Sequence, residues 1–232
     1  MPAAGDPAAA EREGDDAMKR EMALYRVKDG QKKTLTNVMW SGARYIDEAC
    51  EELGLKNASV WSVDNFLYLY AEAEDGNEAG LSSLTGRFAG ELALYAEPIA
   101  LPDEMRLMYH CIGVVRQDKA LIRRRVFATV LKDGCADEYY NRHKKLIDAR
   151  GDAVPDGPET NFTIRCAKEK YIFGYCELVK SYDHEPTAEE RAATAAWETR
   201  QLEIMDWLTD DVDWLTGEKH DKMENLFLQK GY

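Results

Sequence analysis

The residues best suited to chemistry in this chain are Tyr139 and His143, which lie four positions apart. They follow the stretch 130–134, whose sequence Val-Leu-Lys-Asp-Gly is typical of a strand end and a tight turn, so both fall in the first turns of a helix. Positions i and i+4 of a helix project from one face. Because the unperturbed pKa of histidine lies near neutrality, the pair is a candidate for proton transfer.

The elements that position this pair occur twice in the chain. The triplet Lys-Asp-Gly stands at 28–30 and again at 132–134, each time after a short apolar strand and before a helical segment. Each expected helix ends at a glycine, Gly54 in the first half and Gly151 in the second. A hairpin follows in both halves, and its second strands match at a spacing of 105 residues. Near-equal spacing in separate blocks indicates an internal repeat.

Each half is therefore expected to have the order β-α-β-β-α-β, the ferredoxin-like split unit. In the first half, strands are expected at 22–27, 57–63, 66–73 and 105–115, and helices at 32–53 and 80–97. In the second half, strands are expected at 126–131, 161–166, 171–179 and 225–229, and helices at 136–149 and 188–208. The predicted fold class is α+β, with two ferredoxin-like units in tandem. Both sheets keep an apolar face free of helices, so we expect them to pack face to face as a pseudo-dimeric α/β barrel.

Composition sets the domain organisation and excludes several functions. Residues 1–20 are charged and poor in large apolar side chains, which predicts a disordered leader, followed by a degenerate unit over 21–118 and a second unit over 119–232. A net charge of −13 argues against nucleic-acid binding, and the basic run at 123–125 is interpreted as a solvated strand start. No apolar run reaches the about 18 residues of a membrane span. The five cysteines form no CxxC pair, which favours neither zinc nor disulfides and indicates a cytoplasmic protein.

The second half resembles the L-rhamnose mutarotase family, a branch of the dimeric α/β-barrel superfamily. The resemblance covers about 124–232 and rests on Val-Leu-Lys-Asp-Gly-Cys-Ala-Asp-Glu-Tyr before Asn-Arg-His, on Asn-Phe-Thr-Ile at 161–164, and on the strand 171–177. In that family a helical Tyr-x-x-x-His supplies a sugar-contacting tyrosine and the catalytic histidine, which implies these roles for Tyr139 and His143. The implied activity is that of an isomerase that exchanges the α and β anomers of L-rhamnose or a related deoxy sugar, with no cofactor and no metal.

The chain departs from the family pattern at several positions. Phe162 stands where the family has a sugar-contacting tyrosine, and Trp207 is followed by leucine rather than by a second tryptophan. We expect Phe162 and either Trp197 or Trp207 to contact the sugar, because aromatic rings commonly line small-ligand pockets. In the first half Met39 falls where a histidine would be expected, which implies one active site per chain.

Other interpretations stay open. His143, Phe162 and the tryptophans can each be packing groups without a functional role. The chain can also be a non-catalytic or other-substrate member of the same superfamily, either a ligand-binding or interaction module or a monooxygenase-like protein. The expected partner is a small-molecule monosaccharide, with no nucleic acid and no membrane. A further homodimer, beyond the pseudo-dimer within one chain, stays open.

Overall fold

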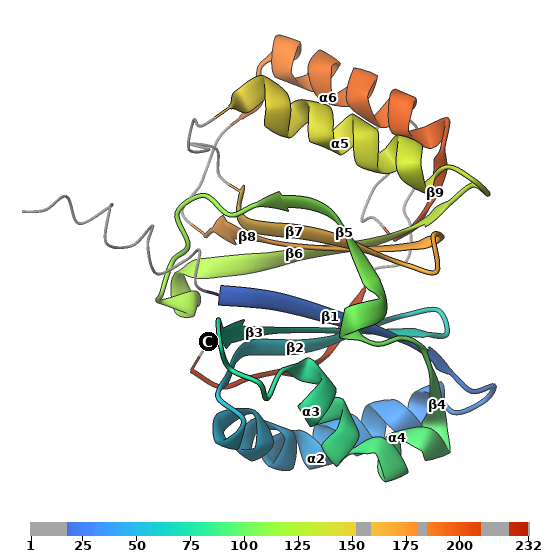
Figure 1. Ribbon diagram of the computed structural model, residues 1–232, viewed down its shortest axis with the longest axis vertical. Helices are drawn as coiled ribbons and strands as arrows, with labels where there is room; N and C mark the ends of the chain where they lie inside the picture. The colour runs from blue at the N-terminus through green and yellow to red at the C-terminus, as the bar shows by residue number, and fades with distance from the viewer. Residues whose placement is uncertain (1–17, 152–158, 181–184, 210–222, 232) are drawn as a thin grey trace, which may run out of the picture.

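Two antiparallel five-stranded sheets face each other in the middle of the molecule, and the helices cover their outer sides (Figure 1). The computed structural model describes residues 18–151, 159–180, 185–209 and 223–231. The α+β class and the two ferredoxin-like units with facing sheets are confirmed.

The first unit consists of β1 (Met18–Val27), α2 (Lys32–Glu52), β2 (Leu55–Val63), β3 (Phe66–Glu74), α3 (Leu81–Arg87), α4 (Ala89–Tyr95) and β4 (Ala96–Ala100). The second consists of β6 (Ile122–Leu131), α5 (Ala136–Arg150), β7 (Glu159–Ala167), β8 (Tyr171–Val179), α6 (Ala188–Leu202) and β9 (Met205–Thr209). Two further strands are β5 (Met105–Cys111) and β10 (Glu224–Leu228), and two 3-10 turns are η1 (Pro102–Glu104) and η2 (Lys119–Leu121).

The glycines that punctuate the repeat adopt the backbone conformation that only glycine adopts readily. Gly30 and Gly134 close the two Asp-Gly turns with φ of 72° and 77°, and Gly54 and Gly151 follow helices α2 and α5 with φ of 64° and 60°. Positive φ at these places costs an L side chain energy that glycine avoids. The paired turn and helix-stop signals therefore predict the element boundaries correctly in both halves.

The sequence pattern places the last strand of each half in its own sheet, and that prediction is wrong. The sheet orders are β10-β2-β3-β1-β4 and β5-β7-β8-β6-β9, so β5 joins the second sheet and β10 joins the first. The fourth strand of each ferredoxin-like unit is instead the short β4 or β9, which pairs with β1 or β6. Residue pattern identifies a strand, but it does not specify which edge that strand will extend.

The second helix of each half is shorter than the sequence predicts. In the first half it breaks at Phe88 into α3 and α4, and α6 of the second half ends at Leu202. The residues that follow form an edge strand whose backbone is paired with a neighbour, so Trp207 lies on β9 opposite Thr129 and not on a helix. The expected leader is also too long, because β1 begins at Met18 and pairs with β3 from there; residues 1–17 lie outside the described residues.

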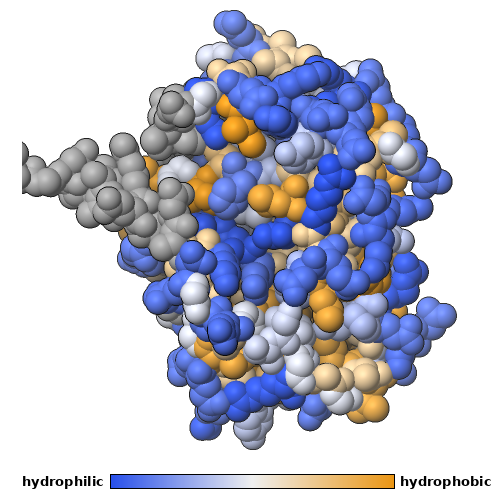
Figure 2. All heavy atoms as spheres, viewed as in Figure 1, coloured by the Kyte–Doolittle hydropathy of each residue, from blue (hydrophilic) through white to orange (hydrophobic). Residues whose placement is uncertain are grey.

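Alternation along the strands divides the apolar residues between two kinds of core. On β3, Tyr68 and Tyr70 face the opposite sheet, whereas Leu67 and Leu69 pack with helices of their own unit. The ring of Tyr70 stacks on Tyr175 of the second sheet with centroids 3.8 Å apart. Each sheet therefore packs against the other sheet with one face and against helices with its other face. Hydrophilic residues cover most of the visible surface (Figure 2).

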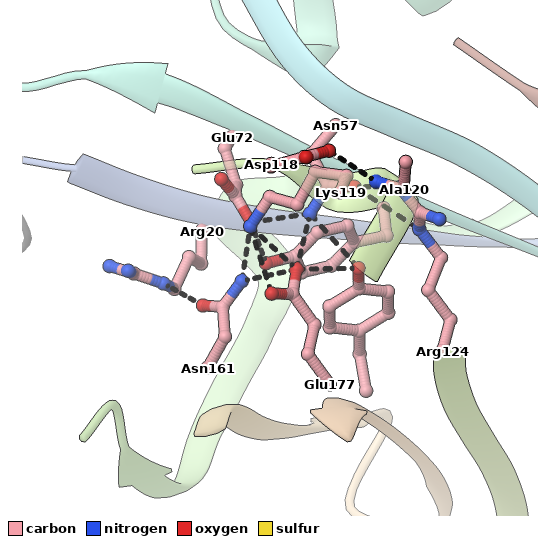
Figure 3. Close-up of polar contacts among 11 residues, drawn as sticks. Arg20, Asn57, Glu72, Asp118, Lys119, Ala120, Arg124, Asn161 and Glu177 are labelled. Carbon is pink, nitrogen blue, oxygen red and sulfur yellow. Dashed lines mark hydrogen bonds and ion pairs between the residues drawn. The ribbon is translucent and has the colours of Figure 1, made fainter. Parts of the chain in front are cut away.

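A buried polar cluster lies between the sheets (Figure 3). Asn57 of β2 donates through Nδ2 to Oε1 of Glu72 (2.7 Å) and of Glu177 (2.8 Å). Asn161 of β7 donates to the same two oxygens at 2.6 and 3.0 Å. The two asparagines have φ of 51° and 52° at irregularities in their strands, a conformation that asparagine tolerates better than most residues. The repeat therefore places one amide and one carboxylate from each half at the centre of the interface.

A cation balances part of this negative charge. Lys119 of η2 lies 2.8 Å from Glu177, and both side chains are almost completely buried. Arg124 donates to Oδ1 of Asn57 at 2.7 Å, and Arg20 donates to Oδ1 of Asn161. Charged groups this deeply buried are tolerated because each finds opposite charge or hydrogen-bond partners.

Glu177→Gln should destabilise the fold by about 3–5 kcal/mol, because it leaves the Lys119 ammonium buried without its counter-charge. Urea unfolding measures the free energy. The matched control is Glu74→Gln, which removes a carboxylate from an exposed pair with Lys56 and should change the free energy of unfolding by no more than about 0.5 kcal/mol. Equal effects of the two variants would contradict the role given to the buried cluster.

Candidate functional site

All five residues expected at the site line one pocket in the second unit. The pocket has a volume of about 760 Å³ and lies between α5, α6 and the helix-covered face of the second sheet. Its lining includes Tyr139 and His143 from α5, Trp197 from α6, Phe162 from β7 and Trp207 from β9. The structure therefore brings together side chains that are up to 68 positions apart in the chain.

His143 is held in one tautomer by its own helix. Its Nδ1 lies 2.9 Å from the backbone oxygen of Tyr139, and since a carbonyl oxygen only accepts, this bond requires the proton on Nδ1. Nε2 then carries the lone pair. Burial lowers the pKa of His143 to about 4, against the opposing effect of the bond to the Tyr139 backbone. The imidazole is therefore neutral at pH 7, with Nε2 as its acceptor.

Aromatic rings surround this imidazole. The Tyr139 ring centroid lies 4.3 Å from that of His143, and Trp197 meets the imidazole edge-on at 5.4 Å. Tyr109 approaches at 5.4 Å. Burial raises the pKa of Tyr139 well above its usual value, so its hydroxyl stays protonated over the whole physiological range.

The sheet side of the pocket is also aromatic. The Phe162 ring lies edge-on to Tyr109 at 5.2 Å and to Phe127 at 6.2 Å, and Phe127 meets Trp207 at 5.9 Å. Edge-to-face contacts at these distances fix the rings with respect to one another. These rings form the apolar part of the lining on the sheet side of the pocket.

Three residues of the pocket lining, Tyr109, Cys111 and Arg150, were not anticipated from the sequence. Arg150 of α5 donates to the sulfur of Cys111 at 2.8 Å, and burial raises the pKa of the neighbouring Tyr109 to about 12. The sequence could have indicated Arg150, because it is seven positions after His143 and so lies on the same helix face. No sequence pattern could have indicated Tyr109 and Cys111, since they reach this pocket only because β5 crosses to the second sheet.

Gln201 is a further pocket residue that sequence reasoning missed. Its side chain is 2% exposed and borders the pocket near the end of α6. Within the described part of the chain, neither its amide nitrogen nor its amide oxygen has a hydrogen-bond partner. Buried amides normally have both atoms bonded, so this one can serve a ligand that both donates and accepts.

The basic run opens strand β6, as interpreted, but two of its three side chains are not simply solvated. Arg124 reaches Asn57 in the buried cluster, and Arg125, which borders the pocket, forms an ion pair with Glu159. Only Arg123 of the three is exposed. Arg124 and Arg125 are partly buried and point to opposite faces of β6, each with a polar partner.

Other features of the described residues bear on possible cofactors. They contain no group of three or more His, Cys, Asp or Glu side chains that could hold a metal ion. The five cysteines are free thiols. Within the same ranges, each helix is either too short or too polar to cross a membrane.

Comparison with known proteins identifies one similar solved structure. It is that of a "Putative monooxygenase" from Fusobacterium nucleatum subsp. nucleatum, with 12% sequence identity, a TM-score of 0.44, and coverage of 90% of this chain and 91% of that chain. This similarity is too low to transfer a fold family or an activity. No protein-family model and no curated protein matches the chain.

The pKa of His143 predicts a specific loss of stability in acid. Its folded-state pKa of about 4 lies below the value of about 6.5 for an unfolded chain, so the unfolded state binds more protons between these pH values. The contribution of His143 to the free energy of unfolding should therefore be fully present above pH 6.5. It should fall as the pH drops toward 4, by an amount on the order of 3 kcal/mol. His143→Gln should lose less stability between pH 7 and pH 4.5 than the wild type, as measured by urea unfolding.

The control is His110→Gln, since His110 is exposed on β5 and lies outside this pocket. It should retain the loss of stability in acid that His143 causes. An unchanged acid loss in His143→Gln would contradict a buried, neutral imidazole.

Proposed function

We propose that this chain is an aldose mutarotase that exchanges the anomers of L-rhamnose or a related deoxy sugar, with the pocket of the second unit as its active site. The observation that carries the proposal is the neutral imidazole of His143, with Nδ1–H bound to the Tyr139 carbonyl and Nε2 available as an acceptor in an aromatic pocket. The resemblance of the second half to the mutarotase family supports the same residues.

Anomer exchange needs one proton to be removed and one to be supplied. In the proposed step Nε2 of His143 takes the proton from the anomeric hydroxyl, the bond between C1 and the ring oxygen breaks, and C1 becomes a carbonyl carbon. The resulting imidazolium returns the proton to the ring oxygen. Both oxygens are attached to C1, so one nitrogen can serve them in turn. Closure on the other face of the carbonyl reverses these steps, and no oxidant or reductant is involved.

The low pKa of His143 favours the return of the proton from the imidazolium to the ring oxygen. A group with a pKa near 4 is a weak base but a strong acid once protonated, so the imidazolium transfers its proton readily to the ring oxygen. The protonated hydroxyl of Tyr139 can then orient the sugar beside it.

The walls of the pocket support a sugar with apolar faces. Aromatic rings such as Trp197 and Trp207 pack against the C–H faces of sugars, and the amide of Gln201 offers a donor and an acceptor for hydroxyls. Phe162 offers a ring without a hydroxyl. A substrate with few hydroxyl groups at that contact, such as a deoxy sugar, is therefore favoured.

A second candidate is a ligand-binding or monooxygenase-like protein that takes a flat aromatic molecule. The observation in its favour is the excess of aromatic side chains around the pocket, including Tyr109, Phe127 and Phe162. Such a protein would not accelerate anomer exchange, so one assay separates the two candidates.

His143→Ala should slow anomer exchange by about 10²-fold or more, as loss of a general acid–base group does. Tyr139→Phe removes only a hydroxyl and should slow anomer exchange by a smaller factor. Saturation-transfer NMR on L-rhamnose and L-fucose measures the exchange rate directly. His110→Ala serves as the control, because it removes an imidazole outside the pocket and should leave the rate unchanged.

Circular dichroism of each variant checks that the fold is retained. Wild-type protein that accelerates exchange for neither sugar would overturn the mutarotase proposal and favour the second candidate. An equal decrease in the exchange rate in His143→Ala and His110→Ala would exclude the assigned role of His143.

A further inference from the structure

The first unit contains a pocket that is equivalent to the candidate active site. It lies between helices α2, α3 and α4 and the helix-covered face of the first sheet and has a volume of about 440 Å³. Five of its lining residues precede, by 104 positions, a residue that lines the pocket of the second unit. The equivalent pairs are Leu35 and Tyr139, Met39 and His143, Gly42 and Leu146, Ile46 and Arg150, and Val60 and Ile164.

The chemistry of the two pockets is opposite at these positions. Where the second unit has a tyrosine, a histidine and an arginine, the first has Leu35, Met39 and Ile46. The expectation that the first half has no acid or base at the position of His143 therefore agrees with the placement of Met39. The space itself is kept, because a Cβ added at Gly42 would meet no atom within 4 Å.

The depth of this pocket distinguishes it from a flat surface patch. Leu35, Leu67 and Leu69 line it and are buried, whereas Tyr45 at its rim is 67% exposed. The walls are helices α2, α3 and α4 and the first sheet, and the lining runs from exposed to buried residues. Such a pocket admits a small molecule, whereas an exposed helix face would suit a protein partner.

The charges at the rim indicate which small molecules fit. The lining contains three carboxylates, from Glu48, Glu52 and Glu91, and one guanidinium, from Arg87. Arg87 forms an ion pair with Glu52. Glu48 is paired in turn with Arg44 at 2.8 Å. Because the guanidinium of the lining is already paired, the rim does not attract an anionic ligand such as a fatty acid.

We propose that the pocket of the first unit binds an uncharged hydrophobic molecule of two to three aromatic rings. Its volume is about three times that of a cavity of about 150 Å³ that holds benzene, and it falls within the usual range for ligand pockets. The proposal is independent of the mutarotase activity, because it involves none of the residues of the second pocket.

Fluorescence titration of the full chain with the neutral probe N-phenyl-1-naphthylamine tests this site. Gly42→Leu adds a branched apolar side chain to the lining, so it should narrow the pocket and weaken probe binding by about tenfold or more. Leucine is also the better helix former, so the fold should be retained. The matched control is Gly90→Leu on α4, where an added Cβ also meets no atom within 4 Å and which does not border the pocket; it should bind like the wild type.

The anionic probe 8-anilinonaphthalene-1-sulfonate should bind more weakly than the neutral one. The proposal is overturned if the wild type does not bind the neutral probe, or if Gly42→Leu binds it as tightly as Gly90→Leu does. It is also overturned if Leu146→Trp, which obstructs the second pocket, abolishes binding while Gly42→Leu does not.

Discussion

The two sheets are joined by two buried amides that each bind both buried carboxylates. Asn57 and Asn161 donate to Glu72 and Glu177, so each carboxylate has donors from both halves of the chain. A donor or acceptor buried without a partner is costly, and any sliding of one sheet over the other would break several of these bonds at once. The relative position of the sheets, and of everything built on them, depends on this cluster.

This interface also decides where ligands can bind. The inner faces of both sheets are filled by one another, with stacked tyrosines beside the polar cluster. Both pockets described above therefore lie on the outer faces, between sheet and helices. A tandem repeat produces two such places by symmetry. Because no contact between the sheets passes through them, their linings are free to differ, and one holds His143 where the other holds Met39.

Strand exchange couples the two units without mixing their pockets. Strand β5 leaves the first unit and extends the second sheet, and β10 returns to extend the first. The exchange covers the β2 and β7 edges, which would otherwise expose unpaired backbone groups. It also brings Tyr109 from the first half of the sequence to the side of His143. The catalytic candidate is therefore formed by one unit and completed by a strand from the other.

The sequence by itself determined the local structure, including which residues share one face of a helix. The Asp-Gly turns, the glycine helix stops and the spacing of Tyr139 and His143 depend only on residues near one another in the chain, and these were predicted correctly. The tertiary structure alone decided that β5 and β10 exchange sheets, that Trp207 lies on a strand, and that Tyr109 and Gln201 reach the pocket. Strand pairing and burial depend on distant parts of the chain, so no local pattern specifies them.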